Sequence, residues 1–149
     1  MSGEPSFPKQ AGEVGKNDLI VMGDKRPCKI VDYSVSKTGK HGHAKASYTA
    51  VDIFDGRKYE DSSPTTHTIQ VPRVETENVI MMANDAEYIQ YMKDDGTDGE
   101  IAIPQYPEGF GDQVIAAFEQ AQKDGQNLTL TIQRSMGIEQ VMAYRSDKN

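Results

Sequence analysis

The sequence predicts a mostly β protein with a single helix, arranged as two consecutive units. Short apolar or β-branched runs alternate with Gly, Pro and Asp turns through most of the 149 residues, which is the spacing of small β barrels. Only residues 111–123 have the apolar spacing of an amphipathic helix. The charge also changes along the chain: residues 1–74 hold eleven Lys and Arg against nine Asp and Glu, whereas residues 75–149 hold five against fourteen.

Composition excludes several classes of protein. A hydrophobic content of 36% suits a folded core rather than disorder. The first eight residues lack the apolar run of a signal peptide, and no eighteen consecutive residues are apolar, so we expect a cytoplasmic protein without a membrane partner. Cys28 is the only cysteine, which excludes an internal disulfide and a CxxC zinc site. We expect it to be a small buried apolar side chain.

The first unit is expected to cover residues 15–74 after a flexible tail of residues 1–14. Two strands form a long hairpin, and the polar stretch that joins them contains Gly39 and Gly42. The Asp55-Gly56 turn then leads into a third strand. A further strand alternates apolar and polar residues before Pro72 ends it. The expected strands are 18–22, 27–35, 44–54, the segment after residue 56, and 67–71.

The second unit is expected to cover residues 75–149. Three strands separated by acidic turns precede the helix, whose shared apolar face should pack on a sheet and which Gly125 can end. Two strands follow, the last running to about Tyr144. Five strands and one helix fit the oligonucleotide-binding (OB) fold, although an α+β sandwich would give the same pattern. The expected strands before the helix are 78–83, 87–92 and 100–103, and the helix face comprises Val114, Ile115, Phe118 and Ala121.

The segment from Ser36 to Lys45 contains three lysines, two histidines and two glycines, and no acid. A core cannot accept this composition. Glycines on both sides of Lys40-His41 permit positive φ and remove side-chain bulk, so the loop can turn sharply and present Lys40 at its apex. Neighbouring cations repel one another, which favours a polyanionic partner. The surrounding residues 25–58 carry eight basic residues against three acids, which is compatible with phosphate binding and equally with a solvated surface.

Three other sites fit this segment poorly. A nucleotide P-loop needs GxxxxGK[ST], whereas His41 follows Lys40 and a strand follows the loop. A metal site of His41, His43 and His67 would lack thiolates and carboxylates, and adjacent lysines would repel the ion. A lysine nucleophile would need a desolvated pocket. We therefore expect no metal site, no catalytic residue and no enzyme activity.

Residues 36–45, Ser-Lys-Thr-Gly-Lys-His-Gly-His-Ala-Lys, resemble the modification loop of the hypusine-bearing translation factor 5A family of eukaryotes and archaea. Agreement continues through most of the first unit. In the second unit it is confined to Pro107-Glu108-Gly109, the helix and Ser135-Met136. The agreeing segments of the first unit are 26–31, 52–54, Gly56, 58–61, Pro64, 66–67 and 71–72.

This resemblance implies an N-terminal SH3-like β-barrel followed by a C-terminal OB-fold β-barrel with one helix. It implies that deoxyhypusine synthase transfers an aminobutyl group from spermidine to Lys40, and that deoxyhypusine hydroxylase completes hypusine, with no other cofactor. It further implies a translation elongation and termination factor that binds the ribosome near the E site. There hypusine would stabilise peptidyl-tRNA and relieve stalling at proline-rich sequences. The alternative is an unmodified RNA-binding module that uses the same basic hairpin.

By the same resemblance, Lys37 and Lys45 would contact ribosomal RNA, and Gly39, His41, Gly42 and His43 would shape the loop for the modifying enzymes. The sequence departs from the family at Ser62-Ser63, where an apolar residue and cysteine are usual. Over residues 46–51 the amino acids differ from those of the family but are of the same chemical character. The acidic stretch 94–100 argues against RNA binding by that part of the second unit, because like charge repels phosphate.

Overall fold

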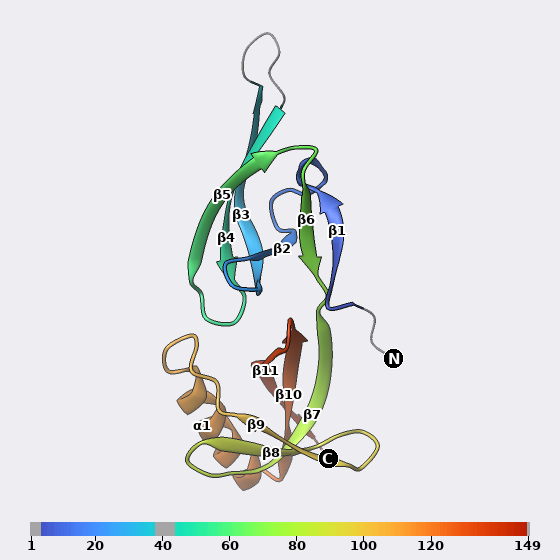
Figure 1. The fold of residues 1–149 in the computed structure, drawn as a ribbon. Helices are drawn as coiled ribbons and strands as arrows, with labels where there is room; N and C mark the ends of the chain where they lie inside the picture. The colour runs from blue at the N-terminus through green and yellow to red at the C-terminus, as the bar shows by residue number, and fades with distance from the viewer. Residues whose placement is uncertain (1–3, 38–43, 149) are drawn as a thin grey trace. The chain divides into compact units, whose positions relative to one another are not determined.

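The computed structural model describes residues 4–37 and 44–148, and it contains two compact units, Met1–Arg73 and Val74–Asn149 (Figure 1). Each unit has its own hydrophobic core. Almost all the regular structure is β, and the single α-helix belongs to the second unit. The expectation of a mostly β protein with one helix is confirmed for the described part of the chain.

The first unit contains a four-stranded antiparallel sheet and a two-stranded one. The larger sheet has the order β2-β3-β4-β5, and the smaller pairs β1 with β6. The strands of the larger sheet are β2 Leu19–Met22, β3 Arg26–Lys37, β4 Ala44–Asp52 and β5 Lys58–Pro64; those of the smaller are β1 Ser6–Gln10 and β6 Thr68–Pro72.

Alternation along β4 explains how the larger sheet builds its core. Ala46, Tyr48 and Ala50 are buried, whereas Ser47 between them is exposed, because successive side chains of a strand point to opposite faces. The buried set extends into the neighbouring strands and includes Cys28, as its apolar character predicted. The core of this unit comprises Ala11, Val14, Ile20, Met22, Cys28, Ile30, Ala46, Tyr48 and Ala50.

The expectation of a flexible tail over residues 1–14 is wrong for residues 6–14. Residues 6–10 form β1, which pairs with β6 from Ser6↔Pro72 to Gln10↔Thr68. A short 3₁₀ turn, η1 (Ala11–Glu13), follows, and Ala11 at its start is completely buried. The backbone N–H of Ala11 donates to the His67 carbonyl at 2.9 Å. The segment therefore belongs to the fold.

The second unit is a five-stranded antiparallel sheet with the order β11-β10-β7-β8-β9 and one helix. This matches the expected five strands and one helix. The strand expected to end near residue 144 runs on to Lys148, because it pairs with β10 along its whole length. The elements are β7 Glu75–Asn84, β8 Tyr88–Met92, β9 Asp98–Ala102, α1 Phe110–Lys123, β10 Gln126–Ser135 and β11 Ile138–Lys148.

Helix α1 begins and ends where the sequence indicates. Val114, Phe118 and Ala121 are buried on one face and join the core formed by the sheet. Gly111 permits the close approach at the start, because a Cβ there would lie 2.5 Å from the Pro104 carbonyl oxygen. Gly125, at φ 66°, follows the last turn in the left-handed conformation that ends many helices. Among the helices of the described residues, none is long and apolar enough to cross a bilayer.

The role of β1 can be tested by truncation. Removing residues 1–10 should lower the free energy of unfolding by about 2 kcal/mol, because the strand's hydrogen bonds and the half-buried Phe7 are lost. The Arg73 guanidinium, 4.9 Å from the Phe7 ring centroid, would also lose that contact. Urea unfolding followed by circular dichroism measures the change. Removing residues 1–3 alone is the control, and equal stability of both truncations would contradict the assignment.

Candidate functional site

The β3–β4 hairpin carries the segment that the sequence analysis singled out. Its register runs from Cys28↔Asp52 at the base to Lys37↔Ala44 at the far end, with Ser36 opposite Lys45. Lys37 and Lys45 are both exposed. The remaining residues expected to shape or carry the site, Gly39, Lys40, His41, Gly42 and His43, lie outside the described residues. The two strands therefore place the start and the end of that loop beside each other.

The far half of the hairpin is much less covered than its base. In β3, every residue from Ser34 to Lys37 is exposed, and Val35 retains 50% of its surface. β2 pairs only with Arg26–Lys29, so it does not border the far half of β3. On the other side, β5 pairs with β4 as far as Lys45↔Pro64. The arm of the hairpin is thus supported along one edge and open to solvent along the other.

A buried carboxylate holds the base of the hairpin. Asp52, at the end of β4, is 1% exposed and accepts a hydrogen bond from Nε of Arg26, at the start of β3, at 2.5 Å. Its other oxygen accepts from the backbone N–H of Phe54 at 2.7 Å and of Asp55 at 3.2 Å. Burial alone would raise the pKa of Asp52, but these bonds outweigh it and lower that pKa. The carboxylate is therefore ionised and fully partnered.

Cys28 lies beside this carboxylate and does not form a reactive site. Its side chain is completely buried, and burial together with the negative charge of Asp52 raises the pKa of the thiol to about 12. The reactive form of cysteine is the thiolate. At neutral pH the Cys28 thiol is protonated and shielded from reagents, so it contributes packing rather than chemistry.

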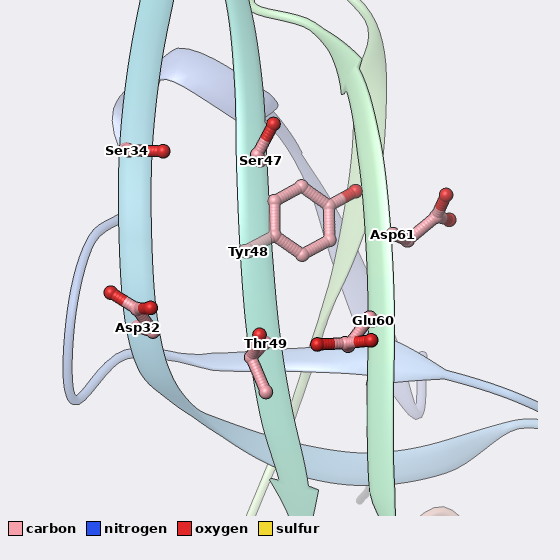
Figure 2. A pocket seen from close by; sticks show the side chains of 7 residues that line it. All are labelled: Asp32, Ser34, Ser47, Tyr48, Thr49, Glu60 and Asp61. Atoms are coloured by element: carbon pink, nitrogen blue, oxygen red, sulfur yellow. The ribbon is translucent and has the colours of Figure 1, made fainter.

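The outer face of the sheet carries polar side chains in rows that cross three strands. The register places Asp32, Thr49 and Glu60 in one row, and the three serines 34, 47 and 62 in the next. All of these residues except Ser62 line a shallow open hollow of about 170 Å³, whose side chains Figure 2 shows on adjacent strands. The hollow is lined by Asp32, Ser34, Ser47, Tyr48, Thr49, Glu60 and Asp61.

This hollow separates two groups of cations. Lys45 lies one row beyond the serines, towards the far end of the hairpin, and Lys29 and Lys58 lie one row beyond the carboxylates, towards the base. Carboxylates repel phosphate, so an RNA backbone is not expected to lie across the hollow. A polyanion that contacts the cations at the far end of the hairpin is therefore not expected to extend over the hollow to those at the base.

The described residues contain no group of three or more His, Cys, Asp or Glu placed to hold a metal ion. His67 is exposed and follows β5, whereas His41 and His43 lie outside the described residues. A site made of all three histidines is therefore not tested, and the expectation of no metal site stays a prediction.

Comparison with known proteins decides the family. Residues 5–67 match the family model described as translation initiation factor 5A-like, N-terminal. Eukaryotic translation initiation factor 5A-2 of Schizosaccharomyces pombe is 43% identical over 141 residues, which cover 94% of this chain and 79% of the relative. The chain belongs to the translation initiation factor 5A family. Eukaryotic translation initiation factor 5A-1 of Saccharomyces cerevisiae is 40% identical, with coverage of 94% and 85%.

Solved structures of the translation initiation factor 5A family share the fold. A family protein from Naegleria fowleri has a TM-score of 0.83 and 34% identity, covering 95% of this chain and 99% of that one. The factor from Methanococcus jannaschii has a TM-score of 0.71 and 25% identity, with coverage of 95% and 96%. The first unit is accordingly an SH3-like barrel and the second an OB-fold barrel, as the resemblance implied.

Sequence reasoning alone did not find the anchor at the base of the hairpin in this family member. Arg26 and Asp52 entered only as parts of segments that resemble the family, because nothing in the order of residues shows that a cation and a carboxylate 26 positions apart will meet. The rows of the outer face were missed for a similar reason, since they exist only once the register is known. Two signals were available: the charges at the ends of neighbouring strands and the serines at alternate positions.

Breaking the anchor should destabilise the first unit. Replacing Asp52→Asn should lower the free energy of unfolding by about 3 kcal/mol, because a buried pair loses one partner. The control is Asp55→Asn, whose carboxylate is 41% exposed and 3.3 Å from Nη2 of Arg26, and which should cost less than about 1 kcal/mol. Urea unfolding at pH 7 measures both, and equal effects would contradict the role of Asp52.

The anchor also predicts a pH dependence. Because the pKa of Asp52 is lowered on folding, its stabilising contribution is present above the ordinary pKa of about 4 and is lost as pH falls through the folded value. The free energy of unfolding of the unchanged protein should fall as the pH is lowered from 5, and it should fall less steeply in Asp52→Asn.

Cys28 should resist thiol reagents in the folded protein. Its reaction with an aromatic disulfide reagent at pH 8 should be at least about a hundredfold slower in buffer than in denaturing urea, because the buried thiol has a raised pKa and no access. Absorbance of the released thiolate follows the reaction. Comparable reaction rates of Cys28 in buffer and in urea would contradict the prediction, because they would show that the thiol is accessible in the folded protein.

Proposed function

We propose that this chain is a non-enzymatic translation factor that binds the ribosome near the E site and acts through hypusine formed on Lys40. Its relatives are named as translation initiation factors, which supports a role in translation. The observation that carries the proposal is the exposed arm of the β3–β4 hairpin, which ends at Lys37 and Ala44. The loop between those ends has the sequence of the family's modification loop.

The charges near the end of the arm support contact with RNA. Lys37 and Lys45 are exposed, and neither has an ion pair among the described residues. Counting along β4 and β5, the nearest carboxylates of the sheet lie three to four residues away from Lys45, about 10–13 Å at the rise of a strand. This exceeds the screening length of about 8 Å at physiological ionic strength. The cations at the end of the arm are thus free to attract phosphate.

Modification would extend this cationic end. Deoxyhypusine synthase would transfer the aminobutyl group of spermidine to the Lys40 Nζ: a new Nζ–C bond forms, the spermidine C–N bond to that group breaks, and 1,3-diaminopropane leaves. Deoxyhypusine hydroxylase would then complete hypusine by adding a hydroxyl group, with molecular oxygen as the oxidant and a reductant supplied to that enzyme. The product carries a secondary and a primary amine at the end of a lysine, and both can donate hydrogen bonds to phosphates and ribose hydroxyls. Gly39, His41, Gly42 and His43 would present Lys40 to these enzymes.

The mechanism that follows is one of positioning. Proline is a poor acceptor of the nascent chain because its ring restricts the geometry of peptide-bond formation. An arm that orients peptidyl-tRNA would lower the entropic part of the barrier to that reaction. The factor transfers no proton, and the catalytic centre is the ribosome's. Stable support of the arm matters here, because a displacement of about 1 Å can cost a large factor in rate. We place this work in the cytoplasm, with translating ribosomes as the partner.

Lys40→Arg separates modification from folding. The variant should keep the melting temperature of the unchanged protein, since the composition of residues 36–45 predicts that Lys40 takes no part in the core, and should lose the hypusine mass increment. Stimulation of peptide synthesis through a proline run should fall at least about tenfold in a reconstituted translation assay, which corresponds to about 1.4 kcal/mol of barrier. Lys16→Arg, a change at an exposed lysine of the first unit, is the control and should retain full activity.

Two results would contradict the proposal. The first is an unmodified Lys40 in protein purified from its own growing cells, measured by mass spectrometry of the peptide that contains it. The second is normal stimulation at proline runs by Lys40→Arg, which would favour the unmodified RNA-binding module instead.

A further inference from the structure

The second unit has an open hollow that the hairpin function does not use. It has a volume of about 390 Å³ and lies where β8 begins and β9 ends. Ile103, which also packs against the core, is half-buried there, and Tyr88 is 41% exposed. The residues that line it are Ala86, Glu87, Tyr88, Ala102, Ile103 and Gln105. Apolar and aromatic surface is therefore available to a ligand.

The backbone around this hollow is held by several hydrogen bonds. The Asp85 carboxylate accepts from the N–H groups of Glu87 and Tyr88, both at 2.8 Å. The Asp85 N–H donates to the Tyr88 carbonyl at 2.9 Å, and the Ile103 N–H donates to the Glu87 carbonyl at 3.0 Å. Tyr88 is paired with Ala102 in the sheet. A ligand would thus meet a site that is already ordered, which reduces the entropic cost of binding.

The charge around the hollow selects the partner. Three acidic residues, Asp85, Glu87 and Glu100, lie at or near the end of β8 and β9 that forms the hollow, whereas Lys93, the one basic residue of segment 84–105, belongs to the turn at the other end. Glu87 lines the hollow, and Glu100 lies two residues from Ala102 on the same face of β9, about 7 Å along the strand. In the OB fold, the face of the second and third strands commonly binds oligonucleotides. Here that face belongs to β8 and β9, and its carboxylates repel phosphate.

We propose that this hollow docks a basic segment of a partner protein. An apolar side chain of the partner would rest on Ile103 and the Tyr88 ring, and a lysine or arginine beside it would meet Glu87, with Glu100 within reach of a long side chain. Charge complementarity favours a basic protein segment over RNA at this hollow. The proposal concerns the OB-fold unit alone and is independent of any modification of Lys40.

The test uses the full chain labelled with ¹⁵N and a synthetic peptide, acetyl-Gly-Arg-Leu-Arg-Gly-amide. Saturable chemical-shift changes should be concentrated at residues 86–88 and 102–105. Tyr88→Ala should weaken binding about tenfold, because an aromatic anchor is removed. The matched control is Tyr106→Ala, which removes a tyrosine of equal exposure, 41%, that does not line the hollow, and it should leave binding unchanged.

The electrostatic part is tested separately. Glu87→Gln should weaken binding about threefold and reduce its dependence on salt, whereas Glu108→Gln, at an exposed acid outside the hollow, should do neither. A peptide with Glu in place of Arg should not bind.

Three results would overturn the proposal. One is the absence of saturable binding of the arginine peptide up to about 5 mM, where even a weak specific site would show itself. Another is equal binding by Tyr88→Ala, or shift changes located elsewhere in the chain. The third is that a ten-nucleotide oligouridine perturbs residues 86–88 and 102–105, which would make this face a nucleic-acid site instead.

Discussion

The hairpin depends on the buried carboxylate of Asp52. Arg26 begins β3 and Asp52 ends β4, so the ion pair joins the two strands at the base of the arm, and the backbone bonds to Phe54 and Asp55 fix the turn that follows. A one-residue slip of register would move every side chain of a strand to the opposite face. The anchor fixes the register at the base, and one shift between Ile30 and Asp32 then leads to the pairing of Lys37 with Ala44, where the loop begins.

A bulge in β3 then sets which face receives the polar side chains. Cys28 and Ile30 are buried at alternate positions, and strict alternation would turn Asp32 inward as well. The register shifts between Ile30 and Asp32, so the extra residue, Val31, is accommodated and Asp32 faces outward beside Thr49. Tyr33 then takes the inner position, where its hydroxyl donates to the Ala11 carbonyl at 2.8 Å. The bulge thus keeps a carboxylate out of the core.

Features that depend on local sequence could be predicted, whereas features that depend on the pairing of distant strands could not. Helix α1 could be predicted to within one residue at its start, because apolar spacing and a terminal glycine are local signals. β1 could not, because Pro8 interrupts its donors and its partner, β6, lies about sixty residues later. The basic loop was evident from composition, since residues 36–45 contain no acid. The hollow beside Tyr88 was not, because it forms only when the ends of β8 and β9 are paired.

The distribution of charge is compatible with the proposed contact between an acidic protein and RNA. A net charge of −7 repels nucleic acid and so disfavours non-specific binding. At physiological ionic strength this repulsion is screened beyond about 8 Å, so a group of cations at the end of an extended arm acts on whatever phosphate comes within that distance. Lys45 lies at that end, and the carboxylates of Asp32 and Glu60 stand behind it. In the proposed function, contact with RNA would then be favourable at the end of the hairpin and unfavourable along its outer face, and this difference would orient the arm with its loop towards the RNA.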